Sequence, residues 1–233
     1  MRKYGIIGAM EEEIEMLKSE MKNAKTTVLA GMTFCEGILW KHPIVVVRSG
    51  IGKVNMAICT QILIDVFKVE ALINTGVAGG LYSELSIGDI VLSSEAMQHD
   101  MDATGFGYQK GEIPRMDTYI FRADEGLIQA AKEACETVNT DIHCFVGRVV
   151  TGDQFIQSSA KKEQLIRDFG GYCAEMEGAA MAQVAFLNHI PFLVIRAISD
   201  KADDSAQMSY EQFEKQAIIH TMKLLAAMFL KMK

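Results

Sequence analysis

The sequence predicts an α/β protein: a single three-layer domain with a central, mixed, twisted sheet flanked by helices. Val- and Ile-rich runs alternate with helical patterns along the 233 residues, and this alternation is typical of a sheet covered on both faces. Apolar runs that follow one another closely between residues 26 and 49 indicate hairpins, so we expect part of the sheet to be antiparallel. Because no linker, repeat or low-complexity tract divides the chain, we expect residues 1–233 to form one domain.

The expected strands are short runs, several rich in Val and Ile, and most are bounded by Gly, Pro or Asp. In chain order they are residues 4–9, 26–30, 33–40, 43–49, 70–75, 89–97, 142–151, 171–175 and 191–198. Helical patterns fall at about 10–22, 52–67, 123–139, 159–168, 177–189 and 209–232. The last helix has the clearest pattern, because an apolar stripe lies opposite a charged side. That stripe comprises Tyr210, Phe213, Ala217, Leu224, Leu225, Met228 and Phe229.

The composition is ordinary for a globular enzyme, with 49% hydrophobic and 23% charged residues. The net charge of −7, without any basic run, makes nucleic acids and anionic membranes poor candidate partners. The five cysteines are scattered and never spaced C-x-x-C, which indicates buried, reduced thiols rather than a disulfide or zinc framework. The apolar stretch after Met1-Arg2-Lys3 is too short for a secretion signal, and no segment is long enough to span a membrane. We therefore expect a cytoplasmic protein.

Acidic residues follow three of the predicted strands. Glu11-Glu12-Glu13 follow the first strand, Glu175 and Glu177 follow the 171–175 strand, and Asp200 follows the 191–198 strand. The glycine-rich segment 76–80 follows a fourth strand and allows a ligand to approach the backbone. Ligands of open α/β sheets bind at the carboxyl ends of the strands, and carboxylates in apolar surroundings need a partner or a function. We therefore expect these acids to share one site.

The first acidic cluster also has a structural interpretation, because acids at the start of a helix complement its dipole. The apolar stripe of the helix predicted there comprises Met10, Ile14, Leu17 and Met21. At about 100° per residue, Glu13 lies closest to that stripe and Glu12 points nearly opposite it. Glu13 is therefore the member of the cluster that we expect in a crevice.

The other acids have structural alternatives as well. Glu177 shares a helical face with apolar residues, but it could equally be a helix-start acid bonded to backbone N–H groups. Asp200 could cap the following helix or belong to the charged turn 200–204, although its position at the end of a buried strand favours a function. Arg196 lies inside that strand and needs a partner if it is buried, for which Glu177 is a candidate.

Three motif-like patterns are rejected. Residues 49–54 resemble a phosphate-binding loop, but the earlier glycine is missing and Val54 stands where Ser or Thr is required. The glycines of 76–80 do not form G-x-G-x-x-G, so a dinucleotide fold is not supported. His99, Asp100 and Asp102 form only a weak metal-binding pattern, and we expect no metal site.

Five segments resemble those of one enzyme family and occur in the same order over nearly the whole chain. They are Gly8-Ala9-Met10-Glu11-Glu12-Glu13, Ser49-Gly50-Ile51-Gly52-Lys53, Asn74-Thr75-Gly76-Val77-Ala78-Gly79-Gly80, Glu175-Met176-Glu177 and Arg196-Ala197-Ile198-Ser199-Asp200. Together they closely resemble the 5′-methylthioadenosine/S-adenosylhomocysteine nucleosidase family of the purine nucleoside phosphorylase-like superfamily. The resemblance implies a homodimeric enzyme that hydrolyses the N-glycosidic bond of adenine thionucleosides without a metal or an organic cofactor.

The resemblance also implies roles for individual residues. Glu13 is similar to the acid that activates the attacking water, and Asp200, supported by Ser199, to the acid that protonates adenine N7. Glu177 matches the carboxylate that binds the ribose hydroxyls. Met176 matches a residue that packs against the sugar, and Arg196 matches a residue near that carboxylate. Glu175 resembles a member of the water network. Phe155 and Ile156 match the adenine-binding segment, and Met10, Ile51 and Phe213 match the apolar wall around the 5′-alkylthio group. Ala78 and Gly79 are the remaining substrate-binding residues implied.

The 105–114 loop is expected to complete the pocket of a dimer partner, through Phe106, Tyr108 and Pro114. One position departs from the family pattern: relatives commonly carry Ser where Val77 stands, which removes a hydroxyl near the base.

Several rival functions stay open at this point. One alternative is a purine nucleoside phosphorylase, which needs a cationic site for phosphate. Arg48 is the residue that could provide such a site. The activity implied by the resemblance could extend to 5′-deoxyadenosine. A hydrolase of another purine nucleoside, such as a futalosine derivative, is also compatible with the pattern. A nucleoside-binding or storage protein is a non-enzymatic alternative, but it would not need both Glu13 and Asp200.

Overall fold

The computed structural model describes residues 1–232, except for the side chains of residues 208, 209, 211, 212 and 214. Its strands are β1 (Tyr4–Gly8), β2 (Lys22–Leu29), β3 (Met32–Leu39), β4 (His42–Arg48), β5 (Ala71–Gly80), β6 (Ile90–Gln98), β7 (Phe121–Arg122), β8 (Cys144–Thr151), β9 (Cys173–Glu175) and β10 (Phe192–Asp200). Its helices are α1 (Glu15–Glu20), α2 (Lys53–Asp65), the short 3₁₀ helix η1 (Thr104–Phe106), α3 (Glu125–Val138), α4 (Ser159–Phe169), α5 (Gly178–Leu187) and α6 (Ala206–Lys231). The predicted α/β class is confirmed.

All described strands belong to one mixed sheet with the order β10-β6-β8-β9-β5-β1-β4-β3-β2, and β7 pairs with β6. Strand β10 also pairs with β5, so β10, β6, β8, β9 and β5 close into a ring. The β2–β3–β4 meander is antiparallel, as the closely spaced apolar runs indicate. Strand β1 runs parallel to β4 and β5, and β10 runs parallel to β5. The carboxyl ends of these four strands therefore lie at the same edge of the sheet.

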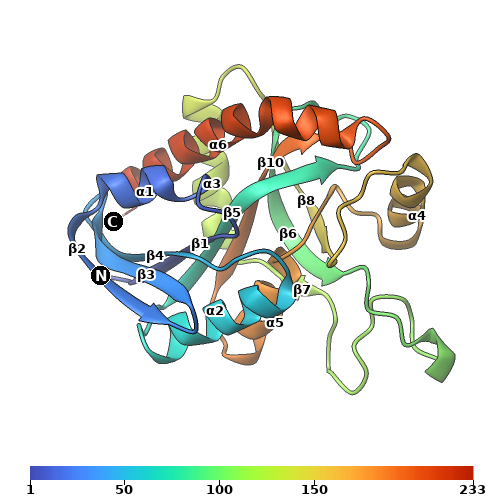
Figure 1. The fold of residues 1–233 in the computed structure, drawn as a ribbon, viewed down its shortest axis with the longest axis horizontal. Coiled ribbons are helices and arrows are strands. Elements are labelled where there is room, and N and C mark those ends of the chain that lie inside the picture. The colour runs from blue at the N-terminus through green and yellow to red at the C-terminus, as the bar shows by residue number, and fades with distance from the viewer. Residues whose placement is uncertain (233) are drawn as a thin grey trace.

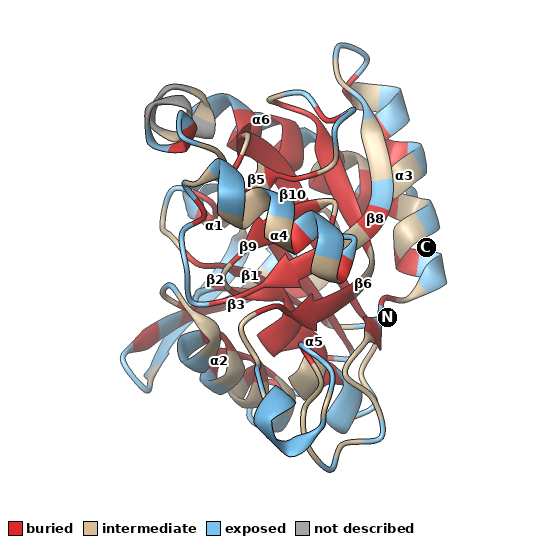
Figure 2. Cartoon of the chain, turned by 90° about the vertical axis from the view of Figure 1, so that its right-hand side faces the viewer, coloured by how far each residue is buried: buried red, intermediate tan, exposed pale blue. Residues whose placement is uncertain are grey.

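Helices cover both faces of the sheet (Figure 1). Helices α1, α3 and α6 lie on one side, and α2 and α5 lie side by side on the other. The enclosed strands β1 and β10 are buried at every residue (Figure 2), which is why they read as continuous apolar runs rather than alternating ones. The edge strand β2 is mostly exposed and carries lysines and threonines, which disfavour pairing with another chain. Among the described residues, no helix has both the length and the apolar character that a membrane crossing needs.

The first predicted helix is shorter than expected. Residues 10–14 form turns, in which the N–H groups of Ile14 and Glu15 both donate to the carbonyl of Glu11, and α1 begins at Glu15. Ile14 and Leu17 are buried as predicted, while the two methionines at the ends of the stripe are half-buried. Because the turn replaces the first helical turn, the orientation of Glu13 is set by the turn rather than by helix phase.

Candidate active site

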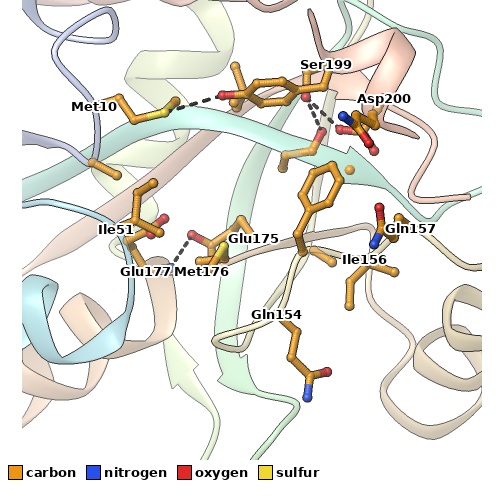
Figure 3. A pocket seen from close by; sticks show the side chains of 18 of the residues that line it. Met10, Ile51, Gln154, Ile156, Gln157, Glu175, Met176, Glu177, Ser199 and Asp200 are labelled. Carbon is orange, nitrogen blue, oxygen red and sulfur yellow. Dashed lines mark hydrogen bonds between the residues drawn. The ribbon is translucent and has the colours of Figure 1, made fainter. Parts of the chain in front are cut away.

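A cavity of about 490 Å³ opens where the ends of β1, β5, β9 and β10 converge (Figure 3). Strand β9 reaches this point although it runs antiparallel to β5, because it pairs only with Gly79 and Gly80 at the very end of β5. The cavity brings together most of the residues expected from the sequence: Met10, Glu13, Ile51, Ala78, Gly79, Phe155, Ile156, Glu175, Met176, Glu177, Ser199 and Asp200. Their elements lie far apart in the chain, so the cavity depends on the strand order.

Glu13 is buried and lines the cavity. Its Oε2 accepts hydrogen bonds from the N–H groups of Ala9 (2.6 Å) and Met10 (3.0 Å), and its Oε1 accepts one from Val77 (3.3 Å). A Cβ at position 76 would lie 2.6 Å from Oε1, so only Gly76 leaves room for the carboxylate. Burial raises the pKa of Glu13, against the charge of Arg196 and these backbone hydrogen bonds. A fixed carboxylate of raised pKa suits a general base, whereas Glu12 is exposed to solvent.

Asp200 ends β10 on another wall of the cavity. Its Oδ2 accepts a hydrogen bond from the Ser199 hydroxyl (2.9 Å), and its Oδ1 accepts one from the Ala202 N–H (2.8 Å). Burial raises its pKa, although both hydrogen bonds oppose the shift. Helix α6 begins only at Ala206, after Ser205, so Asp200 does not cap it. A buried carboxyl group of raised pKa suits a general acid.

A buried ion pair supports the floor of the site. The Arg196 guanidinium donates to Glu175 through Nη2 and through Nε (3.2 Å), and Nη2 also donates to the Asn74 side chain. Glu175 Oε2 accepts further hydrogen bonds from the N–H groups of Glu177 (3.0 Å) and Gly178 (2.7 Å). The candidate partner Glu177 is secondary, because its Oε2 lies 4.0 Å from Nη2 while Glu175 is in direct contact. Charges buried this deeply require such complete pairing.

Glu177 points into the cavity rather than along α5. It occupies the N-cap position of that helix, but its side chain makes no capping hydrogen bond. Instead its Oε1 accepts a hydrogen bond from the Gly52 N–H (2.8 Å). Burial and the repulsion of Glu175 raise its pKa to about 7, against the attraction of Arg196 and the Gly52 hydrogen bond. The interpretation as a simple helix-start acid therefore does not describe its geometry.

Sequence reasoning missed part of the cavity wall. Gln154, Gln157, Gln207 and Tyr210 line it as well. The Tyr210 hydroxyl donates to Met10 Sδ (3.4 Å), and its ring meets Phe155 edge-to-face with centroids 6.1 Å apart. The apolar stripe of the last helix does contain Tyr210, but helical periodicity alone assigned it to the core.

Five predicted site residues are not among the described residues that line this cavity: Arg196, Phe213, Phe106, Tyr108 and Pro114. Phe213 is half-buried, one turn beyond Tyr210. Phe106 lies in η1 and is 87% exposed. Val77 does line the cavity, and its backbone N–H donates to Glu13.

The chain matches known proteins over nearly its full length. Residues 3–230 match the model of the phosphorylase superfamily. A curated 5′-methylthioadenosine/S-adenosylhomocysteine nucleosidase of Exiguobacterium sp. (strain ATCC BAA-1283 / AT1b) is 42% identical over 226 residues, which cover 97% of this chain and 96% of the relative.

Solved structures agree with this match. The Neisseria meningitidis nucleosidase of the same name, in complex with methylthio-immucillin-A, has a TM-score of 0.95 and 38% identity, with full coverage of both chains. The Colwellia psychrerythraea nucleosidase in complex with adenine has a TM-score of 0.94 and 40% identity, covering 98% of this chain and 94% of its own. A futalosine hydrolase of Helicobacter pylori is also similar, with a TM-score of 0.91, 35% identity and 97% coverage of each chain.

Proposed function

Since the chain belongs to the 5′-methylthioadenosine/S-adenosylhomocysteine nucleosidase family of the phosphorylase superfamily, we propose that it hydrolyses the N-glycosidic bond of these two thionucleosides to release adenine. The observation that carries the proposal is the pair of buried carboxyl groups of raised pKa, Glu13 and Asp200, on one cavity. One can act as the base and the other as the acid that hydrolysis of a nucleoside requires.

Asp200 acts on the leaving group in this proposal. Breaking the C1′–N9 bond builds negative charge on the purine, and a proton delivered to N7 relieves it. The raised pKa of Asp200 keeps that proton available, and the Ser199 hydroxyl fixes the orientation of the carboxyl group. Phe155, Ile156 and Ala78 line the cavity, and we assign them to the part that holds adenine.

Glu13 and Glu177 act on the sugar side. Positive charge develops on the ribose as the bond breaks. The carboxyl groups of Glu13, Glu175 and Glu177 outnumber the single guanidinium of Arg196, so the site favours this positive charge. Glu177 presents its carboxylate to the ribose hydroxyls beside Met176, while Glu13 takes a proton from the attacking water. We place the 5′-alkylthio group against Met10, Ile51 and Tyr210, so that Tyr210 takes the position expected of Phe213.

The phosphorylase alternative is tested by phosphate. Arg48 Nε lies 3.9 Å from Glu11 Oε2, and the Arg48 side chain is half exposed. Arg48 is not among the described residues that line the cavity. We expect the protein to release adenine from methylthioadenosine at the same rate with and without inorganic phosphate, with a free reducing sugar as the second product. A requirement for phosphate, with formation of a sugar 1-phosphate, would contradict hydrolysis.

A futalosine derivative is the second candidate substrate, because one similar structure is a futalosine hydrolase. A panel of methylthioadenosine, S-adenosylhomocysteine, 5′-deoxyadenosine and futalosine, compared by kcat/KM, ranks these possibilities. We expect the two thionucleosides to lead the panel.

We further propose a homodimer. Large apolar side chains are exposed on α2, on α5 and in the 105–114 loop, notably Val54, Ile58, Leu187 and Phe106. Solitary exposed apolar residues are normal, but α2 and α5 lie side by side, and a group of exposed apolar side chains on neighbouring helices is typical of an interface. Since the loop does not line its own chain's cavity, Phe106, Tyr108 and Pro114 would reach the cavity of the partner. In the cell we place this dimer in the cytoplasm, in methionine salvage, because the substrate carries the methylthio group of methionine.

A further inference from the structure

Lys53 forms a network beside the cavity that the proposed chemistry does not use. It is the first residue of α2 and belongs to the 49–54 segment that resembles a phosphate-binding loop. Its ammonium group donates to Asp100 Oδ1 (2.6 Å) and to Gln98 Oε1 (2.9 Å). The Lys53 and Asp100 side chains are only 19% and 16% exposed, so this ion pair is shielded from solvent, unlike an ordinary surface pair.

Asp153 completes the network through the backbone. The Lys53 N–H donates to Asp153 Oδ1 (2.9 Å), and the Asp153 N–H donates to Asp100 Oδ2 (2.9 Å). Burial disfavours the charge on Asp100, but the Lys53 and Asp153 hydrogen bonds hold the pKa of Asp100 below its usual range. The three residues, Lys53, Asp100 and Asp153, therefore form a closed ring of interactions, here called the loop clamp.

The loop clamp joins two segments that line the cavity. On one side, Lys53 follows Ile51, which lines the cavity, and Gly52, whose N–H donates to Glu177 Oε1 (2.8 Å). On the other side, Asp153 immediately precedes residues 154–157, which line the opposite wall. Gly52 has a φ of 97°, and a Cβ there would lie 3.1 Å from Asp153 Oδ1, so the two segments meet closely.

We infer that the loop clamp is a positioning device, with Lys53 as its central residue, that holds the 50–52 loop and the 152–157 segment at the spacing the nucleoside requires. This inference rests on the proposed function for its kinetic consequences. Lys53 does not line the cavity within the described part of the chain, so it acts through Gly52 and Asp153.

Removing the ammonium group has a defined consequence for Glu177. Without it, the Asp100 carboxylate loses its cation. The 50–52 loop keeps the hydrogen bond from the Lys53 N–H to Asp153 Oδ1 but loses its second attachment, through the ammonium group, so that it can shift away from Glu177. Glu177 then loses the Gly52 hydrogen bond and keeps only the groups that face it from other elements, namely Glu175, Arg196 and Glu13. Because that hydrogen bond favours the charged form, its loss raises the pKa of Glu177 further above its ordinary value.

The test uses Lys53→Met, Asp100→Asn and the double variant of the full chain. Lys3→Met is the matched control: Lys3 also pairs with a carboxylate (Glu36), its side chain is 25% exposed, and it precedes β1, at the opposite end of that strand from the cavity. Hydrogen–deuterium exchange of the unliganded proteins is measured for residues 49–53 and 152–157. Adenine release from methylthioadenosine is measured as kcat and KM against pH.

We expect Lys53→Met and Asp100→Asn to raise exchange in both segments together, with the double variant no worse than either single one. The KM should rise about tenfold, and the acidic limb of kcat/KM should move up by about one pH unit, as the loss of one charge-assisted hydrogen bond predicts. Exchange that rises in neither segment or in only one, additive effects, or the same changes in Lys3→Met would overturn the inference. If Lys53→Met does not fold, Asp100→Asn alone decides by the same readouts. A wild-type protein inactive on every nucleoside would refute the proposed function, whereas exchange, measured without substrate, would still test the loop clamp.

Discussion

Replacement of Asp200 by Asn isolates the proton donor with little disturbance of the fold. The amide oxygen can keep the hydrogen bond from the Ala202 N–H, and the Ser199 hydroxyl can turn to accept from the new NH₂ group or donate to the Ala78 carbonyl, 3.5 Å away. No charge is added to the buried site, and the side-chain volume hardly changes. We therefore expect the free energy of unfolding to change by no more than about 1 kcal/mol.

The expected loss of activity is large. General acid catalysis typically contributes about 10²–10⁴-fold to the rate, which corresponds to about 2.7–5.4 kcal/mol of activation free energy. The amide can donate a hydrogen bond to N7 but cannot transfer a proton, so the loss should appear in kcat while KM stays within a few-fold. Because the protonated form of Asp200 is the active one, wild-type kcat should fall as pH rises through its raised pKa. The Asn variant should lack this alkaline limb.

The assay follows adenine release from methylthioadenosine in phosphate-free buffer between about pH 5 and 9. Asp203→Asn is the matched control, because it makes the same substitution three residues away. Asp203 accepts hydrogen bonds from Ser205 and is not among the described residues lining the cavity. If Asp200→Asn kept a kcat close to that of the control, or retained the alkaline limb, Asp200 would not be the proton donor.

Three further predictions concern other parts of the molecule. Glu13→Gln should lower kcat at least about 100-fold with substrate binding retained, whereas Glu12→Gln, on the solvent side of the turn, should be nearly silent; equal damage from both in the adenine assay would refute the choice of Glu13. Phe106→Ala should weaken methylthioadenosine binding but not adenine binding, since a buried phenyl ring contributes roughly 1.5–3 kcal/mol; a sedimenting monomer with full activity would exclude the shared pocket. His99 is buried, and neither ring nitrogen has a hydrogen-bond partner among the described residues, so burial lowers its pKa. The unfolded chain therefore binds a proton first, and the free energy of unfolding should fall as pH drops below about 6.5. Urea titrations of His99→Phe should show a smaller fall, and an identical fall would remove His99 as its cause.

Local patterns in the sequence were sufficient to predict most strands and helices, and to select the acidic residues at the ends of the strands as candidates for the site. Val- and Ile-rich runs predict β1 and β10 within two residues, because strands buried on both faces need mostly apolar side chains. Strand β5 was predicted to end at residue 75, but it continues through the glycine-rich segment to Gly80. Acids that follow such strands must be solvated, paired or used, so Glu13, Glu177 and Asp200 could be selected from the sequence alone. The inward direction of Glu13 was predicted from helix phase, whereas the structure produces it by a turn that points the same side chain inward.

The tertiary structure decided which of these residues meet, because pairing depends on strand order and register rather than on sequence distance. Arg196 pairs mainly with Glu175, not Glu177, since the short β9 joins the end of β5 and places Glu175 under the guanidinium. Tyr210 rather than Phe213 lines the cavity, because only the first turns of α6, which also contribute Gln207, lie against it. Closure of β10 onto β5 brings Asp200 beside Gly79. A side chain's periodicity is a local property of the chain, but its partner is chosen by packing between segments that lie far apart in the sequence.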